Sequence, residues 1–260
     1  MGKVWISPAV LHWNVTVQGW KHLPAEIWKR PYILWNHADR YIKAADTELM
    51  LVDGITTLRR VINLRVRQIF RNYELRTLKM RNRGGGTLEL LEQLELIKPS
   101  VLKRLLEVRN VIEHEDRPPP DKTACAELSE FTWYFLRATD HAASAVTVAI
   151  GLTIPRDEDH FFVYDGWGLG IKLTTGPEEQ WRVKMEAALP ASVVSFVENA
   201  GWIEIEVSRT QTRSEWLADN SWFSSDDVAP LSLDDLFLEG SFVGPPSVRD
   251  EIYRLYFAAI

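Results

Sequence analysis

The 260-residue sequence has a single cysteine, Cys125, so it can form neither an intrachain disulfide nor a cysteine-based zinc site. Cys125 stands in an apparently helical stretch, where we expect a buried structural thiol rather than a nucleophile. The triple glycine 84–86 is not followed by the Lys-Ser/Thr of a P-loop, and no Gly-x-Ser-x-Gly elbow is present. Asp157-Glu158-Asp159-His160 has metal-ligand chemistry, but a solvated loop is the expected structure there. The sequence therefore predicts no metal and no cofactor.

Long apolar runs are also missing. The longest run of small apolar residues, Ala142 to Pro155, is too short to cross a bilayer as a helix. The first residues lack the apolar region of a signal peptide, and Ile6 does not fit the myristoylation pattern. We therefore expect a cytoplasmic protein without a membrane partner.

The net charge of −6 conceals an uneven distribution of charge along the chain. Residues 155–260 carry 8 Lys/Arg and 19 Asp/Glu, whereas residues 54–86 carry nine basic residues and one acidic residue, Glu74. The nine basic residues are the predicted RNA contacts: Arg59, Arg60, Arg65, Arg67, Arg71, Arg76, Lys79, Arg81 and Arg83. Such a stretch suits a polyanion, but it could equally pair with the acidic part of the same chain. The sequence alone leaves both interpretations open.

Apolar residues recur every three or four positions between residues 25 and 145, as helices that bury one face require. Pro24 and Pro31 are expected to bracket a short helix or turn, and a long helix is expected to start near Asn36 or Asp39. We expect a break or kink near Gly54, a short helix from Thr87, and a further helix from about Pro99 that ends before Pro118. Asp121 or Thr123 should cap the last helix, which runs to about Ala145.

The pattern changes to strand-like alternation after about residue 158. A hairpin over 161–164 and 168–173 should be followed by a strand at 181–187, a short helix at 191–199 and a strand at 202–207. A final helix is expected from Ser247 to Ala258. The predicted class is α+β, with an N-terminal arm (1–24), a helical bundle (25–147) and an acidic domain (148–260) containing an antiparallel β-meander and helices.

The segment Arg109-Asn110-Val111-Ile112-Glu113-His114 carries the most specific chemistry. On a regular helix Asn110 and His114 share a face, while Arg109 and His114 lie roughly 140° apart, so convergence requires long side chains or a helix that ends at His114. A histidine at a helix C-terminus, beside acidic residues, can exchange protons near neutral pH, and an arginine can hold a phosphate bidentately. An ordinary surface histidine at a charged helix end is the alternative.

This segment resembles the Arg-polar-x-x-x-His motif of the HEPN (higher eukaryotes and prokaryotes nucleotide-binding) superfamily, and the surrounding order of helices, over about residues 25–145, is similar too. The resemblance implies a HEPN-like four-helix bundle that forms a homodimer with two motifs facing one cleft. It implies metal-independent RNA cleavage in a toxin, phage-defence or CRISPR-associated role. By position, Arg109 would bind the phosphate, Asn110 would orient it or the partner's histidine, and His114 would act as acid and base.

We therefore expect a metal-independent endoribonuclease whose partners are RNA, a second copy of the chain and a cognate inhibitor or sensor protein. The alternative is a catalytically silent HEPN-like module that binds RNA or nucleotides, or serves as a scaffold in a defence or regulatory complex. A hydrolase of small molecules in the C-terminal half has no motif to support it.

Overall fold

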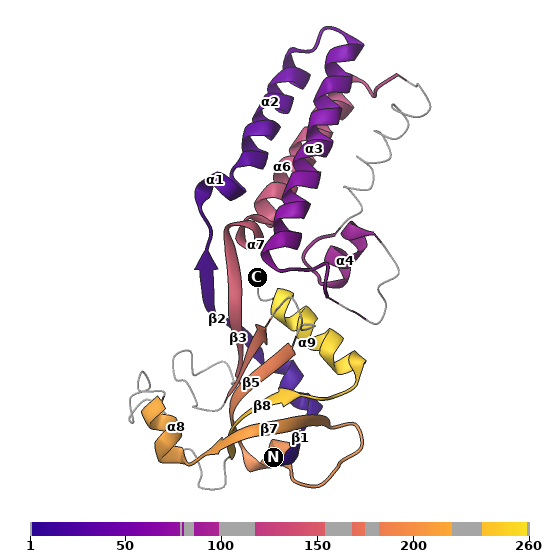
Figure 1. Ribbon diagram of the computed structural model, residues 1–260. Coiled ribbons are helices and arrows are strands. Elements are labelled where there is room, and N and C mark those ends of the chain that lie inside the picture. Colours follow the sequence, from indigo (N-terminus) through magenta and orange to yellow (C-terminus); the bar gives the residue numbers. More distant parts are fainter. Residues whose placement is uncertain are drawn as a thin grey trace, which may run out of the picture. The chain divides into compact units, whose positions relative to one another are not determined.

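The computed structural model describes residues 2–78, 80, 86–98, 118–153, 168–174, 182–219 and 236–258. The chain forms two compact units, one built from Met1–Trp20, Thr77–Asn82 and Thr147–Ala259, the other from Lys21–Arg76 and Arg83–Val146 with Ile260. The first unit contains most of an antiparallel sheet and the second is helical (Figure 1). The predicted α+β class is confirmed.

The helical unit is centred on three helices that pack against one another, α2, α3 and α6. Its described helices are α1 (Ala25–Trp28), α2 (Arg30–Ala44), α3 (Glu48–Asn72), α4 (Thr87–Gln93), α6 (Lys122–Ala138) and α7 (Asp140–Ser144). Leu58, Ile62 and Ile69 of α3 are almost fully buried, as their spacing along the sequence predicted. As expected, Asp121 caps α6 by accepting a hydrogen bond from the Ala124 backbone N–H at 2.9 Å.

Two expected helix boundaries are wrong. α2 begins at Arg30, because Pro31 fits its first turn, whereas Asp39 lies inside the helix and is satisfied by Ser129 at 3.0 Å and Lys43 at 2.8 Å. The last helix does not run to Ala145. α6 ends at Ala138, Thr139 turns the chain by donating its hydroxyl to the Phe135 carbonyl at 2.7 Å, and α7 follows.

The expected break at Gly54 is wrong as well. α3 runs through this position without interruption, and Gly54 is buried against α2. A Cβ at position 54 would lie 2.5 Å from Cγ1 of Ile42, which is closer than real Cβ contacts. The glycine therefore permits close packing of two helices, which is a different use from ending a helix.

One sheet contains all the described strands, in the order β2-β3-β4-β5-β8-β7-β1-β6. The strands are β1 (Lys3–Ile6), β2 (Asn14–His22), β3 (Ala145–Thr153), β4 (Gly168–Thr174), β5 (Arg182–Leu189), β6 (Val194–Ser195), β7 (Ile203–Gln211) and β8 (Leu236–Phe242). The pairs whose registers are described are antiparallel, and β3, β4 and β5 form a meander. The described residues around the sheet also form 3-10 helices at Pro8–His12 and Ala191–Val193 and the α-helices α8 (Arg213–Asp219) and α9 (Pro246–Ala258).

The N-terminal segment belongs to this sheet. β1 pairs with β6 and β7, and β2 lies beside β3, so the sheet starts well before residue 158 and that part of the expectation is wrong. The sequence of Trp13–Val17 favours either a short strand or an arm packed on the rest, and it does not reveal which strands become neighbours. The helix expected at 191–199 is only a 3-10 turn followed by β6. The first strand of the expected hairpin, 161–164, lies outside the described residues.

The predicted C-terminal helix is confirmed as α9, which buries Ile252, Tyr253, Tyr256 and Phe257. The Tyr256 hydroxyl donates to the backbone carbonyl of Thr147, so α9 is tied to β3. Within the described part of the chain, none of the helices combines the length and apolar character that crossing a membrane requires.

Candidate nucleic-acid interface

Helix α3 carries most of the described residues that were predicted to contact RNA. Its apolar residues recur every three or four positions, and Thr47 caps its start by accepting a hydrogen bond from the Met50 N–H at 3.4 Å. The helix has 25 residues. The predicted arginines of this region do not share one environment. They divide into an exposed group, a group already engaged within the chain, and one fully buried residue.

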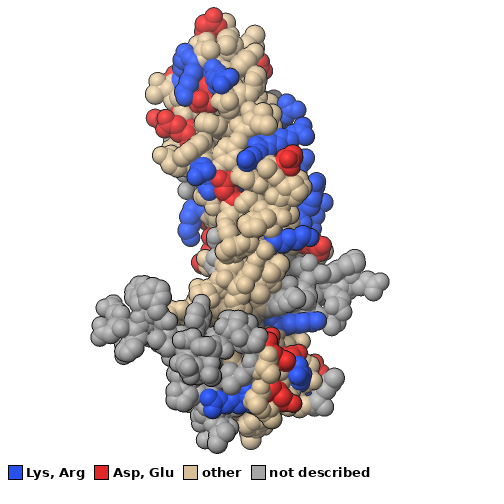
Figure 2. Space-filling model, turned by 90° about the vertical axis from the view of Figure 1, so that its left-hand side faces the viewer, with Lys and Arg blue, Asp and Glu red and all other residues tan. Residues whose placement is uncertain are grey.

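The exposed group is the α3 stripe, which we define as Arg60, Arg67 and Arg71. At 100° and 1.5 Å per residue, these positions fall within about 40° of one another and stand about 10 and 6 Å apart along the helix. No described residue accepts a hydrogen bond from the side chains of these three arginines or forms an ion pair with them. Lys and Arg side chains line one edge of the helical unit in Figure 2.

Such a stripe can follow a polyanionic backbone. Guanidinium groups bind phosphate oxygens bidentately, and such contacts to the backbone position a nucleic acid without reading its sequence. Arg71 also stabilises the C-terminal end of α3, where unpaired carbonyls favour a cation. That structural contribution is about 0.3 to 1 kcal/mol at an exposed site and does not account for Arg60 or Arg67.

Arg59 and Arg76 differ from the stripe. Arg59 is half-buried and Arg76 is exposed, and each already takes part in an interaction within the chain. Lys79, Arg81 and Arg83, which complete the predicted RNA-binding set, lie outside the described residues.

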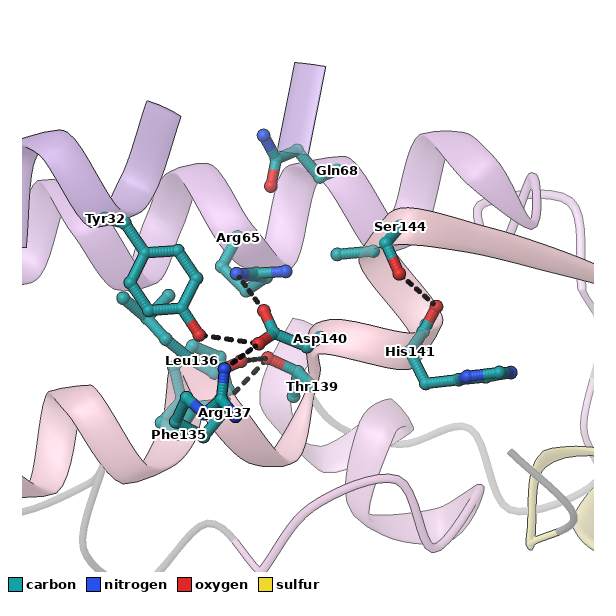
Figure 3. A network of polar contacts seen from close by, with 12 residues as sticks. Tyr32, Arg65, Gln68, Phe135, Leu136, Arg137, Thr139, Asp140, His141 and Ser144 are labelled. Atoms are coloured by element: carbon teal, nitrogen blue, oxygen red, sulfur yellow. Dashed lines mark hydrogen bonds and ion pairs between the residues drawn. The ribbon is translucent and has the colours of Figure 1, made fainter. Parts of the chain in front are cut away.

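Arg65 is fully buried, so it is not part of the exposed basic surface that the sequence suggested. Its Nη2 donates to Oδ1 of Asp140 at 3.0 Å, and Oδ2 of the same carboxylate accepts from Tyr32 at 2.7 Å and Arg137 at 3.2 Å (Figure 3). Burial lowers the pKa of Arg65, and the charge of Asp140 opposes that shift. Asp140 thus serves as the counter-ion that lets α3 bury an arginine.

Tyr32 completes this cluster from α2. Its hydroxyl hydrogen bonds to Asp140, and its ring centre lies 5.6 Å from the guanidinium carbon of Arg65, which is a cation–π contact. Burial, reinforced by the hydrogen bond to Asp140 and by that carboxylate's charge, raises the pKa of Tyr32 to about 12. Nε and Nη1 of Arg65 have no hydrogen-bond partner among the described residues, so the aromatic ring is part of what compensates the buried cation.

Two further polar residues continue along the same side of α3. The Gln68 side-chain amide donates to the Ile27 carbonyl, and Nδ2 of Asn72 donates to the carbonyls of Ala142 and Ala143 at 3.2 and 3.3 Å. This side of α3 therefore secures α1 and α7. The burial of Arg65 could have been predicted from the sequence, because the residue lies three positions after Ile62 and seven after Leu58, on the apolar stripe of α3.

The predicted catalytic residues Arg109, Asn110 and His114 lie outside the described residues, as does the segment Asp157–His160. No cluster of three or more metal-ligating side chains occurs in the ranges that the structure describes. Cys125 is buried, as expected, and burial raises the pKa of its thiol to about 11, so a reactive thiolate is not favoured there.

Comparison of the chain with known proteins gave no match to a family model, to a curated protein or to a solved structure.

Proposed function

We propose that this protein is an RNA-cleaving protein of HEPN type, in which the α3 stripe contacts the RNA backbone. The observation that carries the proposal is that Arg60, Arg67 and Arg71 share one exposed face and have no acidic partner among the described residues. A helix face with three exposed cations that no described residue pairs is suited to an anionic partner. The α+β fold with its helical unit is compatible with the resemblance of the Arg109–His114 segment.

In this proposal the stripe holds the substrate and the motif performs the chemistry. The 2′-hydroxyl of the RNA attacks the adjacent phosphorus after His114 accepts its proton, and the 5′-oxygen leaves with a proton that a histidine returns. Arg109 neutralises charge on the phosphate, Asn110 orients it, and the products are a 2′,3′-cyclic phosphate and a 5′-hydroxyl. The resemblance further implies a homodimer, and a toxin or defence role.

The α3 stripe also supports the second candidate, a module that binds RNA without cutting it, because backbone contacts suffice for binding. One assay distinguishes the ribonuclease from the RNA-binding module. Purified protein incubated with RNA in EDTA should yield cleavage products if the first is correct, and only a complex if the second is correct.

The stripe itself is tested by the double variant Arg67→Gln with Arg71→Gln. Each lost phosphate contact should reduce the slope of log affinity against log salt by about 0.7 for single-stranded RNA, so the double change should reduce it by roughly 1.4 and weaken binding to all sequences alike. The matched control is Lys21→Gln with Lys184→Gln, which removes the same charge from two exposed positions elsewhere. Equal salt slopes for both double variants would contradict an RNA contact at the stripe.

A further inference from the structure

The outer side of α2 carries two aromatic rings in contact with each other, His37 and Tyr41, which we call the α2 ring pair. Their ring centres lie 5.0 Å apart, with an angle of 40° between the ring planes. Both side chains are exposed, Tyr41 to 39%. Trp35 of the same helix, in contrast, is directed inward and donates its indole N–H to the Ser129 carbonyl at 2.9 Å. The α2 ring pair therefore presents aromatic surface to the solvent.

The two rings lie on the side of α2 that faces away from α6. Ile42 faces α3, because its side chain lies against Gly54, and Asp39 faces α6, to which it hydrogen bonds. On a helical wheel Asp39 stands about 60° from Ile42 in one direction, and Tyr41 stands about 100° from it in the other. His37 lies about 40° beyond Tyr41, so both rings are on the side that α6 does not cover.

The α3 stripe lies on the same open side of the two helices. On α3, Gly54 faces α2, and the almost fully buried Ile55 and Ile62 lie about 80 to 100° from it, on the side that the rest of the helical unit covers. Arg60 and Arg71 lie about 100 to 120° from Gly54 in the opposite direction. Because α6 packs against both α2 and α3, its far side is common to the ring pair and the stripe.

Contacts between α2 and α3 fix the level of the ring pair relative to the stripe. The two helices pack side by side, with Gly54 against Ile42 and the guanidinium of Arg65 over the ring of Tyr32, so they run antiparallel (Figure 1). The α2 ring pair is therefore level with the turn of α3 that directly precedes Arg60. The rings and the arginines form one row along the helical unit, with the rings at one end.

The charge on this side changes sign at the ring pair. Asp53 is exposed and lies within about 20° of Arg60 around α3, but it stands at the end of the row that is farther from the other arginines. A carboxylate at that place repels a phosphate, whereas it can accept a hydrogen bond from the amino group of a base. The row is thus suited to phosphates over the arginines and to bases at the rings.

We propose that the α2 ring pair binds bases of an unpaired stretch of RNA whose phosphates lie on the α3 stripe. This inference rests on the proposed function, since it takes RNA as the partner. Every base has a flat face that can stack on Tyr41 or His37, so the site accepts all four bases. In a duplex these faces are covered by neighbouring bases, so the ring pair contributes only to the binding of a single strand.

The test measures the binding of a labelled single-stranded oligonucleotide with 2′-O-methyl sugars, which the proposed reaction cannot cleave. Tyr41→Ala should weaken binding about fivefold or more, because a stacking contact is lost. Tyr41→Phe keeps the ring and should retain the affinity that Tyr41→Ala loses. Tyr134→Ala, which removes an exposed tyrosine from α6, is the control at another site and should bind like the wild type. Circular dichroism melts establish that the variants fold.

Two further measurements separate the rings from the stripe. Tyr41→Ala should leave the slope of log affinity against log salt unchanged, because it removes no phosphate contact, whereas Arg60→Gln should reduce the slope by about 0.7. Binding of an RNA duplex of the same length should be equal for Tyr41→Ala and the wild type.

The possible results distinguish this inference from the proposed function. If the wild type and Tyr41→Ala bind the single strand equally, the ring-pair site is wrong, while RNA binding by the stripe stands. The same holds if Tyr41→Phe binds as weakly as Tyr41→Ala, since the hydroxyl would then be the contact. Equal losses for single strand and duplex would mean that Tyr41 contacts the backbone, and would also overturn the site. A wild type that binds neither nucleic acid would overturn the proposed function together with this inference.

Discussion

The helical unit and the sheet unit differ in what their charged side chains do. In the sheet unit several basic residues have acidic neighbours at close range: Lys3 lies 2.6 Å from Glu204, and Arg209 lies 3.4 Å from Asp219 and 3.3 Å from Glu239. On α3 of the helical unit, the exposed arginines of the stripe have no such neighbour among the described residues. Net charge is therefore a poor guide to function, and the pairing of individual charges is a better one.

The same comparison can be made within α3 between two arginines that are two residues apart. Arg65 is fully buried against Asp140, whereas Arg67 is exposed and unpaired among the described residues. Both come from a stretch that the sequence presented as one basic segment. The first arginine holds the helical unit together, and the second is available to a partner.

Substitutions in the catalytic motif should change activity most. His114→Ala should slow RNA cleavage by about 10²- to 10⁴-fold, because a proton-transfer group is removed, and Arg109→Ala should have an effect of similar order through lost charge stabilisation. Wild-type cleavage should persist in EDTA, leave a 2′,3′-cyclic phosphate, and fail on RNA that carries 2′-deoxy at the cut site. RNA binding to the α3 stripe should survive both substitutions. Cleavage that requires a divalent metal would overturn the mechanism and favour the binding module.

The next effect concerns stability. Arg65→Met should destabilise the fold by about 3 kcal/mol, because breaking a buried ion pair leaves Asp140 without its buried partner. Arg67→Met should change stability by less than about 0.5 kcal/mol, as an exposed substitution does. Urea denaturation of both variants measures the difference. Equal stabilities would show that the buried cluster contributes nothing to the free energy of unfolding. Weaker RNA binding by the Arg67 variant, with unchanged stability, would separate the two roles.

The presence of helices at α3, α4, α6 and α9 was predictable from apolar spacing and from caps such as Asp121, but the uninterrupted run of α3 and the end of α6 were not. The sequence could not show that Gly54 allows close packing against Ile42, because the same residue type also ends helices. It could not assign β1 and β2 to the sheet, because alternation does not specify a strand's neighbour. At the candidate site, the density of basic residues in the sequence pointed to the arginines of α3. Only the structure shows that Arg65 is buried and Arg67 is exposed.

The smallest change is expected in the stability of a variant of the buried cluster, and it depends on pH. Tyr32→Phe removes the hydrogen bond to Asp140 and should cost about 1 kcal/mol of stability at pH 7 to 9. The pKa of Tyr32 is raised to about 12 in the folded protein, above the ordinary tyrosine value of about 10. A raised pKa contributes stability that is fully present below the unfolded value and is lost as pH rises toward the folded value.

The free-energy difference between wild type and Tyr32→Phe should therefore shrink between pH 10 and 12, because only the wild type must keep this tyrosine protonated while the unfolded chain ionises it. Urea denaturation at several pH values measures that difference. Tyr41→Phe, at an exposed position on the same helix, is the matched control and should show a small difference from wild type at every pH. A Tyr32→Phe difference that stays constant up to pH 12 would mean that the hydroxyl is not held in the cluster around Asp140, and the contrast between the buried and exposed sides of α3 would then rest on Arg65 alone.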